Sequence, residues 1–379
     1  MSKSNETTPK VPTLRFAEYT DEWHKFALSD FVTRITRRNK HNESSLPLTI
    51  SAQYGLVDQI TFFNKTVASV DLSGYYLLYN GDFAYNKSYS NDYAWGAVKR
   101  LEKYEKGCLS SLYFVFRPTD KVDSDYLTHY FETNKWHKGI SDIAGEGARN
   151  HGLLNMSVDD YFATKHYLPT LSEQRKIADF LNLIVKRIEI QNKIISKYET
   201  LIKGLCDKIF RRNKTVSLSD LVICKTSTLQ ENEVVNENSG QYNVFGASGI
   251  IASISNYQFD RNAILVLKDG SKAGKIQYAS GKYSVVGTSV ILIPKNELDT
   301  KYLYFAMLAI DFAQYKVGSG IPHIYFKDYS SEKIYYPDET QRNRIEKALT
   351  SYETKLEVEK RMLSALQEQK AFLLQSMFI

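Results

Sequence analysis

Apolar residues recur at alternating spacings of four and three in two stretches of the chain, residues 171–212 and 338–379. This spacing places the apolar residues in one narrow stripe along a helix. Such a stripe predicts two long helices that pair as a coiled coil, rather than two helices that each pack separately on a domain of their own. Ser172 and Glu173, after Pro169, mark a helix start. At about 1.5 Å per residue, a helix of roughly 38 residues spans about 57 Å, the length of a spacer. The seam positions are Ile177, Leu181, Ile184, Ile188, Gln191, Ile195, Tyr198, Ile202, Leu205 and Ile209, then Ile345, Leu349, Tyr352, Leu356, Glu359, Leu363, Leu366, Lys370, Leu373 and Met377.

The segments 12–170 and 213–337 have the short β-rich runs and turn dipeptides of mixed α/β (α+β) domains. Residues 1–11 are polar, and we expect a disordered tail there. In the second domain we expect strands at 263–267, 276–279, 283–286 and 290–293, then a helix over 301–316. In the first domain we expect a strand at 112–116 and a helix over 125–138.

The order of these segments reflects an internal repeat. Leu181 and Leu349 lie 168 residues apart, and the same interval separates Phe210 from Phe378 without a gap. Matches between the two globular segments are looser, so the helices are nearly alike while the domains have diverged. The fold expected is two mixed α/β domains separated by an antiparallel coiled coil with pseudo-two-fold symmetry.

Two polar residues interrupt the apolar seam at equivalent positions, Gln191 and Glu359. In an antiparallel pair both lie near the middle, close to each other. A polar seam residue often fixes register at some cost in stability. These two residues are therefore predicted to set the coiled-coil register.

Composition narrows the classes of function. The formal net charge of +6, from 49 basic and 43 acidic residues, favours an anionic partner only weakly. The cysteines, Cys108, Cys206 and Cys224, have neither disulfide nor zinc spacing. Together with the absence of a membrane-length apolar run and of a signal-peptide core, they predict a reducing cytoplasmic location without membrane contact.

Several fragments imitate catalytic signatures. Residues 245–249 contain a glycine pair, but an apolar strand-like segment follows where a cofactor loop requires a helix. Residues 270–275 resemble a phosphate loop, but the glycine spacing is one short and Ile276 replaces the magnesium-binding hydroxyl. Asp338 and Glu353 resemble part of a nuclease motif, but Glu353 falls on the predicted helix, too far away to share a metal ion. We therefore predict no catalytic, cofactor-binding or metal-binding residues.

The chain resembles one known family, the specificity subunits of type I restriction-modification enzymes. The most specific match is Leu168-Pro-Thr-Leu-Ser-Glu-Gln-Arg-Lys-Ile-Ala-Asp-Phe-Leu181, continuing to 203–210. Segments 13–16, 242–250 and 318–323 also fit. The second helix carries Gln341 and Arg342 where the first has the family's Glu-Gln pair.

The resemblance implies that each domain is a target recognition domain that reads one half of a split double-stranded DNA sequence, and that the coiled coil fixes the gap between the halves. It implies two methyltransferase (modification) subunits as partners and two restriction (motor-nuclease) subunits, in a system of phage defence. S-adenosylmethionine, ATP and Mg²⁺ then belong to those partners, and the chain itself has no cofactor.

DNA reading requires amide, aromatic and basic side chains on loops that reach a groove. A solvated surface charge is the alternative for each candidate. The glycine-flanked loops around Arg149 and His323 are preferred, because they recur at equivalent points of the repeat. The predicted DNA-binding residues are Arg37, Arg38, Lys40, Gln53, Tyr54, Asn86, Lys87, Tyr89, Arg149, Asn150, His151, Lys268, Lys272, Lys275, Lys316, His323 and Lys327.

Three other functions stay open on the sequence alone. The chain could serve a methylation-only complex that lacks a nuclease partner. It could be a self-contained DNA methyltransferase or nuclease, against which the missing motifs argue. It could be a coiled-coil adaptor, against which two large, diverged domains argue.

Overall fold

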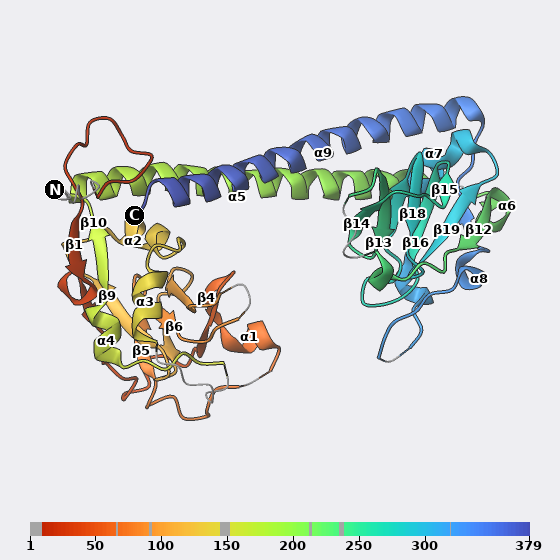
Figure 1. The fold of residues 1–379 in the computed structure, drawn as a ribbon. Helices are drawn as coiled ribbons and strands as arrows, with labels where there is room; N and C mark the ends of the chain where they lie inside the picture. The colour runs from red at the N-terminus through yellow and green to blue at the C-terminus, as the bar shows by residue number, and fades with distance from the viewer. Residues whose placement is uncertain are drawn as a thin grey trace. The chain divides into compact units, whose positions relative to one another are not determined.

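The computed structural model describes residues 10–65, 67–90, 93–144, 152–211, 214–234, 239–318 and 320–379. The predicted tail at 1–11 falls almost wholly outside them. The chain divides into two compact units, residues 1–190 with 363–379 (unit 1) and residues 191–362 (unit 2). Each unit contains one globular domain and part of each of two long helices (Figure 1).

The first domain is built on a four-stranded antiparallel sheet with the order β2-β9-β6-β7, beside two two-stranded antiparallel sheets, the hairpin β3-β4 and the pair β5-β8, whose strands are separated in the chain by β6 and β7. A further antiparallel pair, β1-β10, leads the chain into the first long helix. The strands are β1 (His24–Ala27), β2 (Val32–Arg34), β3 (Leu48–Ser51), β4 (Gly55–Asp58), β5 (Tyr76–Tyr79), β6 (Phe83–Asn86), β7 (Ala97–Arg100), β8 (Lys106–Leu109), β9 (Phe114–Pro118) and β10 (Lys165–Leu168). The helices are α1 (Gln59–Phe63), α2 (Ser124–Tyr130), α3 (His137–Ile143) and α4 (Val158–Ala163).

Aromatic side chains fill the core of the first domain. The rings of Phe83 and Phe116 stack with centroids 5.6 Å apart, and those of Tyr85 and Tyr161 stack at 4.7 Å. The same buried cluster includes apolar residues from both long helices, so the domain and the helix ends share one core. Burial of this aromatic area stabilises the attachment of the domain to the helices.

The second domain has two four-stranded sheets, β12-β19-β16-β17 and β14-β13-β18-β15, and a short pair, β11-β20. The strands pair antiparallel except β13 with β18. The strands are β11 (Val216–Ser217), β12 (Val222–Thr226), β13 (Tyr242–Gly246), β14 (Gly249–Ile254), β15 (Phe259–Asp260), β16 (Ala263–Leu267), β17 (Ile276–Ala279), β18 (Lys282–Val285), β19 (Ser289–Pro294) and β20 (Lys333–Ile334). The helices are α6 (Leu218–Leu221), α7 (Thr300–Met307) and α8 (Phe326–Tyr329).

The long helices are α5 (Leu171–Phe210) and α9 (Glu339–Ser376). In unit 1 the beginning of α5 packs against the end of α9, because Ile177 and Leu181 share a buried cluster with Leu373 and Phe378. The helices are therefore antiparallel, as expected. In unit 2 the side chain of Gln191 donates to the Glu359 carboxylate at 2.5 Å and to its carbonyl oxygen at 3.0 Å.

The buried face of α5 drifts away from the predicted heptad near the end of the helix. Leu205 and Ile209 are only half-buried, whereas the following residues, Cys206 and Phe210, are 0% and 1% exposed. A straight helix with 3.6 residues per turn drifts in this way relative to a 3.5-residue repeat. The seam prediction therefore holds over most of the helix and shifts by one residue at its C-terminal end.

Two predicted helices prove shorter than expected. The helix expected over 125–138 is interrupted between α2 and α3, where the Thr133 hydroxyl donates to the Tyr130 carbonyl and accepts from the Lys135 amide. Such local side-chain bonds compete with helical ones. The helix expected over 301–316 ends at Met307, and Asp311 caps a separate turn by accepting from the Ala313 amide. The strand expected at 112–116 begins at Phe114.

The four strands expected in the second domain are present, within one residue at each end. In the part of the chain that the structure describes, no helix combines the length and the apolar character needed to cross a membrane.

Candidate nucleic-acid interface

Two neighbouring turns at one edge of the second domain bring most of its predicted DNA-binding residues together. The first turn, 268–275, follows β16, and the second segment runs from Val317 to Ile324. Backbone hydrogen bonds join them, from the Gly270 amide to the Pro322 carbonyl at 3.0 Å and from the Ile324 amide to the Lys268 carbonyl at 2.9 Å. Lys268, Lys272, Lys275 and His323 therefore belong to one surface, which we call the paired-turn edge.

Glycines hold the paired-turn edge in its shape. Gly318 has a φ of +97°, and a Cβ there would lie 2.7 Å from the Ile321 carbonyl oxygen. Gly274 has a φ of +89°, and a Cβ there would lie 2.5 Å from Phe312. The backbone conformation at these two positions therefore requires glycine.

The paired-turn edge carries uncompensated positive charge. On the edge, Lys272 and Lys275 are exposed and Lys268 is half-buried, and Lys316 and Lys327, which flank the second turn in the sequence, are also exposed. Their ammonium groups form no ion pair with any residue among those described, although Lys327 lies over the Tyr325 ring at 5.6 Å. Free ammonium groups on fixed turns suit phosphate binding.

In the first domain the arginine candidates already have partners. Arg37 forms an ion pair with the fully buried carboxylate of Asp82, which Arg117 also contacts at 2.6 Å. Arg37 also donates to the Leu77 carbonyl at 2.7 Å. Arg38 lies over the Tyr76 ring at 4.1 Å and donates to the Gly74 carbonyl. The Arg37 guanidinium is therefore engaged through two of its nitrogens, whereas Arg38 makes one hydrogen bond and one ring contact inside the domain.

The other candidates of the first domain are more accessible. Gln53 and Tyr54 lie at the turn between β3 and β4, where Tyr54 is 60% exposed. Lys40 is exposed, and Tyr89 is 52% exposed. Asn86 accepts from the Ser88 amide, and Lys87 lies 4.9 Å from the centre of the Phe114 ring. Arg149, Asn150 and His151 lie outside the described residues.

An exposed aromatic cluster beside Tyr54 was not predicted from the sequence. Phe62 and Phe63 of α1 are 43% and 44% exposed, and their ring centroids are 5.0 Å apart. The Phe62 ring lies 6.3 Å from that of Tyr54. Their spacing in the sequence is equally compatible with a buried strand, so no sequence signal marked them as exposed.

Equivalent residues of the repeat anchor each domain to its own long helix. In unit 1, Gln174 accepts from the Asp123 amide at 2.8 Å, and Asp123 caps α2. Arg342 occupies the corresponding place in unit 2, where it binds Asp299, the residue before α7, at 2.7 Å. Each side chain also donates to a proline carbonyl five residues earlier, Gln174 at 2.9 Å and Arg342 at 2.7 Å. The second helix thus has an arginine where the first has Gln174, and the Asp299 carboxylate balances the added charge of Arg342.

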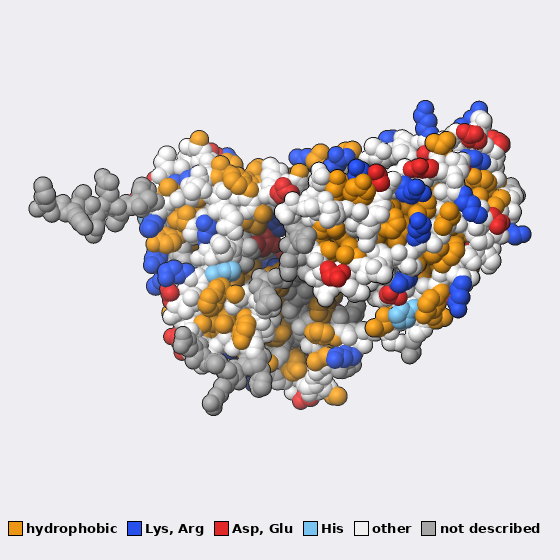
Figure 2. Space-filling model, turned by 45° about the vertical axis from the view of Figure 1, so that its right-hand side comes forward, with side chains coloured by type: hydrophobic (Ala, Val, Ile, Leu, Met, Phe, Trp, Pro, Cys, Tyr) orange, Lys and Arg blue, Asp and Glu red, His pale blue; other side chains and the backbone are white. Residues whose placement is uncertain are grey.

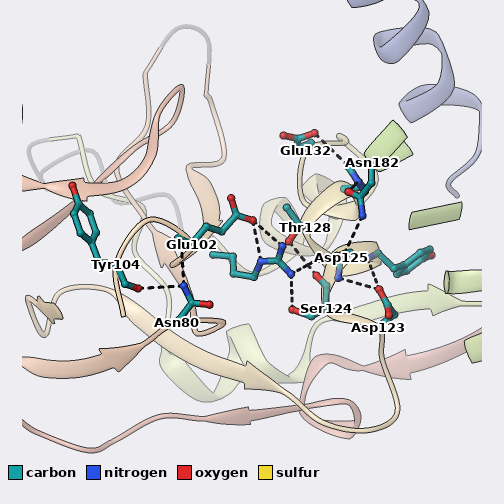
Figure 3. Close-up of polar contacts among 12 residues, drawn as sticks. Asn80, Glu102, Tyr104, Asp123, Ser124, Asp125, Thr128, Glu132 and Asn182 are labelled. Carbon is teal, nitrogen blue, oxygen red and sulfur yellow. Dashed lines mark hydrogen bonds and ion pairs between the residues drawn. The ribbon is translucent and has the colours of Figure 1, made fainter. Parts of the chain in front are cut away.

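A polar network extends the anchor in unit 1 (Figure 3). The Asn182 amide of α5 donates to Asp125 of α2 at 2.9 Å, and its oxygen lies 2.9 Å from a His129 ring nitrogen. Arg100 of β7 contacts the same Asp125 at 2.6 Å. Burial alone would raise the pKa of Glu132, but contacts with His129 and with Lys370 of α9 outweigh it and lower that pKa to about 2.

The visible surface is not uniformly basic. On the face drawn in Figure 2, lysine and arginine side chains are interspersed with hydrophobic, acidic and uncharged ones. Among the described residues, no three His, Cys, Asp or Glu side chains are grouped so that they could hold a metal ion.

Comparisons with known proteins show which proteins this chain is similar to. Residues 211–368 match the family model described as "Type I restriction modification DNA specificity domain". The match covers the second domain and most of α9. The family resemblance inferred from the sequence is confirmed.

Two curated proteins with similar sequences are also type I specificity subunits. Over 155 residues the chain is 25% identical to the type I restriction enzyme EcoDI specificity subunit of Escherichia coli, and over 145 residues it is 28% identical to the MjaVIII specificity subunit of Methanocaldococcus jannaschii. These matches cover 40% and 37% of this chain, and 34% of each relative, so the chain spans about a third of the length of these curated relatives.

Solved structures share the fold over nearly the whole chain. The type I restriction-modification S subunit from M. genitalium superposes with a TM-score of 0.59 and 17% identity, and covers 97% of this chain and 99% of its own. A chain from a structure described as the "complex assembly and conformational transition of the type I R-M system" superposes with a TM-score of 0.53 and 15% sequence identity. The match covers 93% of this chain and 96% of that one. At such identity these likenesses show the fold alone.

Proposed function

We propose that the protein is the specificity subunit of a type I restriction-modification complex, which reads a split DNA target and holds its partner subunits. The observation that carries the proposal is the repeat of two unlike domains on two nearly alike helices. Gln174 and Arg342 anchor these domains at equivalent places. A shared frame with different domains is the architecture required to read two different half-sites.

The DNA would be gripped through the paired-turn edge in the second domain. Lys268, Lys272, Lys275, Lys316, His323 and Lys327 would supply these contacts. In the first domain, Lys40, Gln53, Tyr54, Asn86, Lys87 and Tyr89 remain accessible, and Arg149, Asn150 and His151 remain proposed readers. Arg37 and Arg38, which already make contacts inside the first domain, would contribute to DNA binding mainly by holding the shape of the domain and through their positive charge.

The internal symmetry supports two modification subunits as partners. Ile190 and Val358 are equivalent in the repeat, and both are apolar side chains that stay exposed, at 47% and 50%. Two equivalent apolar positions on the paired helices suit two copies of one partner. Restriction subunits would join through the modification subunits, and a methylation-only complex is the alternative arrangement.

The chain itself would be non-catalytic. S-adenosylmethionine, ATP and Mg²⁺ would be bound by the partner subunits, and the specificity subunit would supply only target choice and geometry. A cytoplasmic location follows from this role, because the DNA and the partners are there.

Reconstitution tests the proposal. The purified chain, incubated with DNA and radiolabelled S-adenosylmethionine, should transfer no methyl group, and addition of the modification subunit should produce methylation at one split sequence. Methyl transfer by the pure chain would overturn the non-catalytic role. A reconstituted complex that methylates DNA without regard to sequence would overturn the assignment as specificity subunit.

A further inference from the structure

His323 and Asp269 form a hydrogen-bonded pair within the paired-turn edge. The His323 Nδ1 atom lies 2.8 Å from Asp269 Oδ1, and the two side chains are 39% and 35% exposed. The two residues also face each other in a β-bridge, and His323 exchanges both backbone hydrogen bonds with Val317 at 2.8 and 2.9 Å. The imidazole is therefore fixed through its backbone on one side and through Nδ1 on the other.

This fixation leaves one edge of the ring available. Because a carboxylate only accepts, Nδ1 carries the proton that it donates to Asp269. In the neutral ring Nε2 is then an acceptor with no hydrogen-bond partner among the described residues. A side chain held in this way can read a base edge at little further entropic cost.

The charge around His323 favours contact with a DNA groove over contact with another protein. On residues 268–275 and 316–328 there are five lysines and two acids, Asp269, which pairs with the imidazole, and the exposed Asp328. Ile321, two residues before His323, is 62% exposed, and an exposed apolar side chain near a base reader can contact a thymine methyl group. Lysines flanking one oriented reader form the expected arrangement of phosphate grip around a base contact.

We propose that His323, oriented by Asp269, is a specificity-determining residue of the second domain, and that its Nε2 contacts the exocyclic amino group of an adenine or a cytosine in the major groove. The inference rests on the proposed function, since it concerns how the chain reads DNA. Asp269 is a positioning residue, because it acts through the imidazole.

The test uses the reconstituted methyltransferase complex and a DNA library with every base of the split target randomised. Bound and methylated molecules are sequenced for the wild type and for His323→Ala, Asp269→Ala and His323→Gln. His323→Ala should lower discrimination at one base pair of one half-site by roughly 5- to 100-fold and leave the other half-site unchanged. Asp269→Ala should lower it at the same base pair by a smaller factor.

Two variants distinguish a loss of base recognition from a loss of folding. His24→Ala, which removes an exposed histidine of β1, should leave every base preference unchanged. His323→Gln keeps a polar group of similar reach, and it should alter preference at that same base pair even if His323→Ala fails to fold. Variants that weaken binding equally for all sequences would overturn the inference and leave the proposed function standing. A wild-type complex without sequence preference would overturn the proposed function itself.

Discussion

The guanidinium of Arg342 on α9 binds the carboxylate of Asp299, with 2.7 Å between Nε and Oδ1, and both residues are almost fully buried. Tyr336 and Asn296 also donate to Asp299, at 2.5 and 2.8 Å, so its oxygens are fully engaged. Burial alone would lower the pKa of Arg342, but the hydrogen bond to Asp299 and its charge raise it. This buried pair attaches the second domain to α9, as does the ion pair between Lys301 of α7 and Glu353 of α9.

Removal of one partner of the pair should destabilise unit 2 strongly. Arg342→Ala leaves the Asp299 charge buried without its counter-ion, which should cost about 3–5 kcal/mol of unfolding free energy. Gln174→Ala, at the equivalent neutral site, should cost only about 1–3 kcal/mol. Urea unfolding of each variant measures the difference. As a control, Lys355→Ala on the exposed face of α9 should change the free energy by less than about 0.5 kcal/mol. Equal losses at Arg342 and Gln174 would show that the ion pair has no special role.

Acid should weaken unit 1 through His166. Its ring is 3% exposed, its nitrogens lie 2.8 Å from the hydroxyls of Tyr130 and Thr164, and burial lowers its pKa to about 4. Below the ordinary histidine pKa of about 6.5, the unfolded chain binds a proton that the folded chain does not. Stability should therefore fall as pH decreases from about 6.5 to 4, by up to about 3 kcal/mol.

Unfolding free energies measured at several pH values between 7 and 4 check this linkage. His166→Asn should remove about one proton from the pH dependence in that window. His24→Ala, which changes an exposed histidine, serves as the control. A pH dependence that is unchanged in His166→Asn would mean that other groups cause the acid sensitivity.

Lys272 and Lys275 should contribute affinity without sequence information. The variant with both lysines replaced by alanine should bind all sequences more weakly in the complex. Each lost phosphate contact should reduce the slope of log affinity against log salt by about 0.9. An unchanged slope, measured by titrations at several salt concentrations, would mean that these lysines do not contact phosphate.

The paired helices should act as a ruler. Seven residues inserted into each helix, near Gln191 and Glu359, keep the seam in phase and add roughly 10 Å. At about 3.4 Å per base pair, the gap between the half-sites should grow by about three base pairs, while the half-sites stay the same. Methylation mapping measures the gap. A folded, active variant that still methylates the original spacing would contradict the ruler.

The sequence predicted the periodic elements best. The seam of α5 and α9 and the β-rich runs of the second domain were clear because burial imposes periods of 3.5 and 2 on side chains. The breaks after Tyr130 and Met307 were missed, because they depend on local hydrogen bonds of Thr133 and Asp311 that compete with the helix. Helix propensity alone does not reveal them.

The candidate site was only partly predictable. Lysines near glycine turns marked the paired-turn edge, because lysines and turn-forming residues can both be recognised in a sequence. The partners of Arg37 and His323 were not visible, since Asp82 and Asp269 lie 45 and 54 residues away in the chain. Whether a charge is free or neutralised is settled by tertiary contacts, which a single sequence does not contain.

Each domain should read its own half of the target, independently of the other. Replacement of residues 214–336 by the equivalent domain of another specificity subunit tests it most directly, with single-molecule sequencing of methylated DNA from cells that carry the complex. One half-site should change to that of the donor, while the other half-site and the spacing are retained. A change in both half-sites, or in neither, would contradict it.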